Sequence, residues 1–164
     1  MKTPITQEEL KGLLRYDADS GVFTWLVSRR ACAGFGVVAG HLNSDGYMVI
    51  GIKGSDYSAH RLAFLYMTGS FPCNNVDHIN CVRSDNRWIN LRDATDAENK
   101  RNQLLRSSNT SGFKGVEKVN KRWRARIRLN GVRHSLGVFL TPEEAHAAYR
   151  SASAIMHGEY GRVA

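Results

Sequence analysis

The first 58 residues combine one helix pattern with two strand patterns. Thr6 and Glu9 have the spacing of a capping box, in which each side chain bonds the backbone N–H of the other residue at a helix start. A turn sequence leads into an apolar and aromatic run at 22–25, and a second such run occupies 46–52. We therefore expect a small β-rich lead-in over 1–58. The apolar stripe of its helix would be Leu10, Leu13 and Leu14.

The middle of the chain has the order helix, strand, loop, helix. Apolar positions over 60–67 are typical of a helix, and a glycine and a proline follow soon after. Residues 76–79 predict a short strand before a polar loop. A second capping box, Thr95 with Glu98, then begins another helix.

The C-terminal segment has the most regular pattern. Over 122–129 every even position is Arg and every odd position is apolar, so a strand there would carry four guanidinium groups on one face. Asn130-Gly131 predicts a hairpin turn into a partner strand at 132–139, and Thr141 caps a helix with proline in its first turn. The side chains expected to join helix to sheet are Ala145, Ala148, Ala152 and Ile155, against Trp123, Ile127 and Leu129.

Charge separates this segment from the rest. Of the net charge of +8, residues 105–164 contribute +7. Such an asymmetry favours a polyanionic partner, with nucleic acid ahead of an acidic protein or membrane surface. The polar stretch 107–112 is the expected linker, which gives an α+β chain of two domains. Their predicted limits are 1–106, divided into the lead-in 1–58 and a core at 59–106, and 113–164.

Composition argues against a membrane protein, a secreted protein and a disulfide-bonded one. No apolar run reaches the roughly 20 residues of a membrane helix, and no secretory signal opens the chain, so a cytoplasmic protein is expected. Cys32, Cys73 and Cys81 are odd in number and form no C-x-x-C pair, which favours reduced thiols. A zinc site that uses Cys73 and Cys81 stays an alternative.

Asp77 and His78 are the first candidates for chemistry. Hydrolysis of a phosphodiester needs a base for the attacking water and a cation near the leaving oxygen. Adjacent residues on a strand point to opposite sides, which suits a carboxylate on a metal and an imidazole on water. The alternative is an ordinary histidine that bonds its own turn.

Several motifs in order resemble the HNH nucleases, specifically the phage-type homing endonucleases. They are His60-Arg61-Leu62, Val76-Asp77-His78-Ile79, the run Asp85 to Arg92 and the run Glu98 to Asn102, with a similar lead-in at 16–25. The resemblance covers about residues 5–105. It implies His78 as general base, Asn90 as the residue that orients its ring, and Asp77 with Asn99 as ligands of one divalent ion, Mg²⁺ or Mn²⁺. Asn86 and Asn102 stay alternatives, with Asn86 favoured as a turn-capping residue.

Residues 108–164 resemble the DNA-binding domain of the Apetala and ethylene-response-factor type. The motifs are Ser111 to Val116, Arg122 to Ile127, Leu136 to Phe139 and Pro142 to Tyr149. The resemblance implies a three-stranded sheet that lies in the major groove of DNA. Glu117 departs from the basic residue usual there. The residues expected to contact DNA are Arg61, Lys114, Arg122, Arg124, Arg126, Arg128 and Arg133.

The expected function is therefore metal-dependent hydrolysis of double-stranded DNA at a preferred site, with no obligatory protein partner. The alternative is a non-enzymatic DNA-binding regulator that carries a degenerate nuclease segment. Structured RNA is a third substrate, which a sheet suited to the wide major groove of B-form DNA disfavours.

Overall fold

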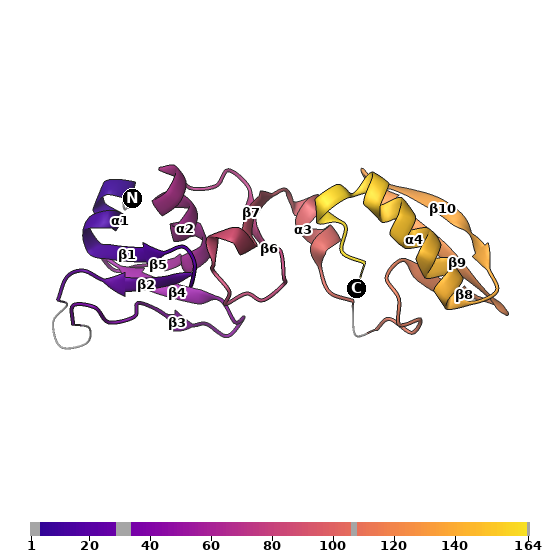
Figure 1. Ribbon diagram of the computed structural model, residues 1–164, viewed down its shortest axis with the longest axis horizontal. Coiled ribbons are helices and arrows are strands. Elements are labelled where there is room, and N and C mark those ends of the chain that lie inside the picture. Colours follow the sequence, from indigo (N-terminus) through magenta and orange to yellow (C-terminus); the bar gives the residue numbers. More distant parts are fainter. Residues whose placement is uncertain (1–3, 29–33, 106–107, 164) are drawn as a thin grey trace. The chain divides into compact units, whose positions relative to one another are not determined.

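The computed structural model describes residues 4–28, 34–105 and 108–163. Its contacts divide the chain into two compact units, Met1–Ala94 and Thr95–Ala164. Both units combine helices with small antiparallel sheets, which confirms the α+β class (Figure 1). The contacts divide the chain before the expected linker at 107–112, so the domain limits taken from the sequence stay a prediction.

The first unit is built from short elements in three antiparallel sheets, among the residues described. The sheets have the strand orders β1-β2, β3-β4-β5 and β6-β7, and α1 packs against α2 (Figure 1). The elements are α1 (Gln7–Leu13), β1 (Leu14–Asp17), β2 (Val22–Trp25), β3 (His41–Leu42), β4 (Met48–Ile52), β5 (Ser55–Ser58), α2 (Ala59–Thr68), β6 (Asn75–His78), the 3-10 helix η1 (Trp88–Asn90) and β7 (Leu91–Ala94).

Most of the expected elements of this unit are present. The capping box at Thr6 begins α1, and both predicted strand runs form β2 and β4. Leu14 is buried as expected, but it begins β1 instead of ending the helix. Cys32 lies outside the described residues.

One hydrophobic core joins the lead-in to the segment that carries the candidate chemistry. Phe23 of β2, Ile50 of β4 and Leu62 of α2 are almost completely buried in it, and Leu91 of β7 belongs to the same cluster. The lead-in is therefore part of the fold that supports the β6–β7 hairpin.

The second unit consists of a three-stranded sheet covered by a long helix, together with a short helix at its start. The sheet has the order β10-β9-β8, and α4 contacts all three strands (Figure 1). The elements are α3 (Asp96–Asn102), β8 (Val116–Val119), β9 (Arg122–Leu129), β10 (Val132–Phe139), α4 (Pro142–Met156) and the 3-10 helix η2 (Gly158–Tyr160).

The predicted hairpin and both predicted helix starts of this unit are confirmed. Strands β9 and β10 have the expected bounds, and Asn130 and Gly131 have the positive φ angles that a tight hairpin turn requires. Thr95 and Thr141 both form complete capping boxes.

The buried face of α4 differs from the expected one. Ala145 is fully buried, but Ile155 is 85% exposed, and Tyr149 and Ser153 are buried in its place. At about 100° per residue, Tyr149 and Ser153 lie about 40° and 80° around the helix axis from Ala145 in one direction, whereas Ile155 lies about 80° from it in the other direction, roughly 120° from the middle of the buried face. Ile155 therefore points away from the sheet.

Among the residues that the structure describes, no helix has the length and apolar character needed to cross a membrane.

Candidate active site

Antiparallel pairing of β6 with β7 positions the two residues singled out by the sequence. In this register Asp77 is opposite Arg92 and His78 is opposite Leu91. Asp77 and His78 are both buried, with 4% and 5% of their surface exposed. Because they are neighbours on a strand, their side chains leave on opposite sides and have different surroundings.

The carboxylate of Asp77 binds the guanidinium of Arg92. Nε of Arg92 donates to Oδ2 of Asp77 at 2.8 Å, and a second guanidinium nitrogen lies 2.7 Å from the same oxygen. The pair is largely buried, so each charge compensates for the desolvation of the other.

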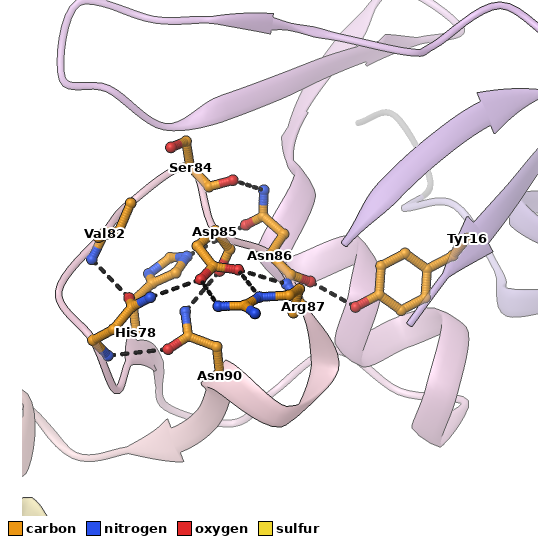
Figure 2. A network of polar contacts seen from close by, with 9 residues as sticks. Tyr16, His78, Val82, Ser84, Asp85, Asn86, Arg87 and Asn90 are labelled. Carbon is orange, nitrogen blue, oxygen red and sulfur yellow. Dashed lines mark hydrogen bonds and ion pairs between the residues drawn. The ribbon is translucent and has the colours of Figure 1, made fainter. Parts of the chain in front are cut away.

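The ring of His78 contacts Asn86. Nε2 of His78 lies 3.3 Å from Oδ1 of Asn86, and Nδ2 of Asn86 donates to the carbonyl of Ser84 at 3.2 Å (Figure 2). Since an amide oxygen only accepts, the contact requires the imidazole proton on Nε2. The lone pair of the neutral ring is then on Nδ1.

Two further rings pack beside His78. His60 of α2 meets it edge to face with 5.1 Å between ring centroids, and the Tyr47 ring lies 6.0 Å from it. Burial lowers the pKa of His78 below its usual range, against the opposing effect of the Asn86 hydrogen bond. Burial, helped by the charge of neighbouring groups, lowers the pKa of His60 to about 4. Both rings are therefore neutral at pH 7.

Asn90 organises the loop that follows β6. Its Oδ1 accepts from the backbone N–H of Asn80 at 3.0 Å, and its Nδ2 donates to the carbonyl of Asp85 at 2.8 Å (Figure 2). Asn90 was expected to orient His78, and Asn86 was expected to cap a turn. The structure gives the contact with the ring to Asn86, which is only 2% exposed.

A network of charged and polar side chains fixes the same loop. Asp85 forms a two-point ion pair with Arg87, at 2.8 and 2.6 Å, and accepts from Nδ2 of Asn80 at 2.6 Å. The hydrogen bonds from Arg87, the largest cause, lower the pKa of Asp85 to about 2. The carboxylate is thus charged throughout the neutral range, and its bonds to Arg87 and Asn80 cross-link the loop.

The lead-in holds this loop from the other side. The hydroxyl of Tyr16 donates to the carbonyl of Asn86 at 2.6 Å, and the N–H of Trp88 donates to the carbonyl of Ala18 at 2.9 Å. Gly21 has a φ of 73°, and a Cβ there would overlap the backbone of Asn86 and Arg87. Sequence reasoning missed these contacts, although the glycine of a predicted turn was visible.

Arg61, expected to contact DNA, makes contacts within the protein. Its guanidinium donates to the carbonyls of Asn74 and Pro72 at 3.3 and 3.4 Å, and it lies over the ring of Phe71. These bonds fix the segment between α2 and β6.

The expected metal ligands belong to different units. Asp77 is on β6, whereas Asn99 is on α3 and is half-buried. A carboxylate has two oxygens with about four acceptor directions, so an ion pair on Oδ2 is compatible with a metal on the same group. One carboxylate and one amide oxygen, completed by water and phosphate, are donors that Mg²⁺ accepts. The residue types therefore fit a divalent ion.

No group of three or more His, Cys, Asp or Glu side chains within the described ranges is arranged to hold a metal. Cys73 is exposed and Cys81 is half-buried, and neither forms a disulfide with another described residue. This gives no support to the alternative of a zinc site at these cysteines.

The arginine row of β9 consists of Arg122, Arg124, Arg126 and Arg128. As predicted, it occupies the face of the strand that points away from the core residues. Ala125 and Ile127 are buried, while Arg122 and Arg128 are exposed. Arg128 is directly opposite Arg133 of β10. Two like charges in this position repel each other, and an anion between them would remove the repulsion.

Glu117 of β8 neutralises the middle of the row. It forms an ion pair with Arg126 and lies 3.6 Å from Arg124. The ammonium of Lys114 donates to the carbonyls of Arg101 and Gln103, so Lys114 ties α3 to the sheet of the same unit. Of the residues expected to contact DNA, those left exposed without an ion pair are Arg122, Arg128 and Arg133.

Comparison with known families matches one part of the chain. Residues 57–101 match the model of the HNH endonuclease family. The matched segment contains α2, the β6–β7 hairpin and most of α3, and with them Asp77, His78, Asn90 and Asn99. The match supports a nuclease. The comparisons with curated proteins and with solved structures gave no match.

Proposed function

We propose that this protein is a metal-dependent DNA endonuclease of the homing type, in which His78 is the general base. The observation that carries the proposal is the setting of His78 within the segment that matches HNH endonucleases. Its ring is buried and neutral, and its contact with Asn86 leaves the lone pair on Nδ1. A neutral imidazole held in one orientation is suited to take a proton from water.

In the proposed reaction Nδ1 of His78 removes a proton from a water molecule, and the resulting hydroxide attacks phosphorus. The P–O bond to the leaving sugar oxygen breaks, and that oxygen receives a proton from solvent. Asp77 and Asn99 would hold a divalent cation, which supplies positive charge to the phosphate and the leaving oxygen. Asn86 holds the imidazole proton on Nε2 throughout.

The exposed face of the second unit is the proposed DNA-binding surface. A hollow of about 250 Å³ on it is lined by charged residues, Glu117, Arg126, Arg128 and Arg133, together with Gly115, Val116 and Ile127. We propose, from the resemblance to plant DNA-binding domains, that this sheet enters the major groove. A phage-encoded enzyme that works in a bacterial cytosol is part of the same proposal.

The nuclease proposal is tested with supercoiled DNA and the full-length protein. We expect nicked or linear product with Mg²⁺ or Mn²⁺ and none with excess chelator. Asn99→Ala is expected to lose activity, and high Mg²⁺ to restore part of it, because a ligand is lost and the base is kept. Retained DNA binding without cutting under any metal would favour the non-enzymatic regulator.

The DNA-binding surface is tested by salt dependence. Replacing both Arg128 and Arg133 with Gln is expected to reduce the slope of log affinity against log salt by about two units, since each phosphate contact contributes about 0.9. Replacement of Arg15 and Arg150 with Gln serves as the control of equal charge, because both are exposed and neither belongs to this surface. A control that flattens the slope as much would contradict the assignment of the surface.

A further inference from the structure

The loop between β6 and η1 carries an arginine for which the proposed chemistry has not yet given a role. Arg83 is exposed, and its guanidinium lies 5.0 Å from the centroid of the Tyr47 ring. One of its terminal nitrogens donates to the carbonyl of Asp45 at 2.7 Å. A stacked guanidinium with one fixed hydrogen bond is held in place before any ligand arrives.

Arg83 differs from the other arginines near the hairpin in its charge balance. Arg87 is paired with Asp85, and Arg92 is paired with Asp77. Within the described residues no ion pair joins Arg83 to a carboxylate. A guanidinium has five N–H donors, and a single protein hydrogen bond leaves most of them for an anion.

The position of Arg83 connects it with the candidate base. Tyr47, on which it stacks, packs against both His60 and His78, with centroids 5.3 and 6.0 Å away. An anion bound by Arg83 would therefore lie in the neighbourhood of His78.

We infer that Arg83 binds a non-bridging oxygen of the scissile phosphodiester and stabilises the negative charge that develops as water attacks. The inference rests on the proposed nuclease function, because it needs a phosphate to be cut beside His78. Arginine is suited to the task because its planar donors match phosphate oxygens. Stabilisation of developing charge by one such donor is typically worth a factor of about 100 or more in rate.

The test measures the single-turnover cleavage rate and the DNA affinity of full-length variants separately. We expect Arg83→Gln to slow cleavage about 100-fold while its dissociation constant changes less than about threefold, since one contact among many is lost in binding. Arg83→Lys keeps the charge without the planar donors, and it is expected to be intermediate. Arg15→Gln is the control, because it removes the same charge from the face of β1 opposite to Tyr16 and is expected to cut like the wild type.

Chemical rescue separates a contact with phosphate from a structural effect on Tyr47. Millimolar guanidinium is expected to raise the rate of Arg83→Ala several-fold and to leave His78→Ala inactive. If Arg83→Gln cuts at the wild-type rate while His78→Ala is inactive, the inference is wrong and the nuclease proposal stands. Parallel losses of rate and affinity, or no rescue, would also overturn it. If the wild type cuts no DNA with any divalent metal, the proposed function fails and the inference fails with it.

Discussion

The chemistry of His78 depends on the side chains around it more than on its place in a motif. Burial favours the uncharged ring, and the amide of Asn86 selects one tautomer. Asp77, its neighbour in sequence, points the other way and forms an ion pair with Arg92. Two adjacent residues thus have different partners because the strand sends their side chains into different surroundings.

His60, a member of this buried cluster, is expected to make the stability of the protein depend on pH. Its folded pKa of about 4 lies below the ordinary value of 6.5, so the unfolded chain binds more protons between these values. The contribution of His60 to the free energy of unfolding is therefore fully present above about pH 6.5. This contribution, roughly 3 kcal/mol, is lost as the pH falls toward 4. Denaturant unfolding of the wild type and His60→Gln across that range measures it. A difference between the two that does not change with pH would contradict the pKa.

Single residues of the site were predictable from the sequence to different degrees. The opposite directions of Asp77 and His78 were predictable because a short strand fixes which way neighbours point. The contact of the His78 ring with Asn86 and not with Asn90 was not predictable, because the loop between the strands has no periodicity. Which asparagine turns inward depends on the contact of the loop with Tyr16, which is 70 residues away in sequence.

At the scale of elements, the β1–β2 hairpin positions the loop of the β6–β7 hairpin. Its turn approaches the backbone of Asn86 and Arg87 so closely that no side chain fits at Gly21. Phe64 of α2 packs edge to face on Trp88, the first residue of η1. This contact supports the end of the loop. The geometry of the candidate base is therefore a property of the whole first unit.

Gly21→Ala tests this support. The new methyl group would overlap the loop backbone, and the positive φ adds strain, so we expect a loss of about 2–4 kcal/mol in stability together with a lower cleavage rate. Gly46→Ala is the matched control, because Gly46 has a φ of 81° with open space around its Cβ position. It is expected to cost only about 1 kcal/mol. Unfolding curves and nicking rates measure both, and equal effects would refute the close approach.

Elements with a local signal were predicted well. The three capping boxes, the alternation over β9 and the Asn-Gly turn each act within a few residues, and all are present. The short strands β1, β3 and β5 have no comparable pattern and form through pairing with neighbours. Ile155 was misplaced because the fully buried positions of α4 include a tyrosine and a serine, which hydrophobicity alone does not select.

At the scale of the whole molecule, charge is concentrated where the second unit presents its sheet. Glu117 is the exception on that surface, since it pairs with Arg126 and Arg124 and would compete with the phosphates of the proposed DNA partner for them. The carboxylate also reduces the repulsion within the arginine row before DNA is bound. We therefore expect Glu117 to make the free protein more stable and its proposed DNA binding weaker.

Glu117→Gln is expected to tighten DNA binding by about three- to tenfold at low salt, because it frees two arginines and removes a negative charge from the surface. Glu143→Gln, in the first turn of α4, removes the same charge from the element that covers the other face, and it is expected to have less than a twofold effect. Fluorescence titrations on one duplex compare them. Weaker binding by Glu117→Gln would show instead that the carboxylate positions the arginines for recognition.

The central claim is that His78 acts on the bond to be cut and contributes little to holding DNA. Its most direct test is the single-turnover cleavage rate of full-length His78→Ala, measured with saturating Mg²⁺ beside its affinity for the same DNA. Loss of a general base is expected to slow cleavage by a factor of about 100 to 10,000, with the dissociation constant within about twofold of the wild type. Cleavage at the wild-type rate, or a loss explained entirely by weaker binding, would contradict the account.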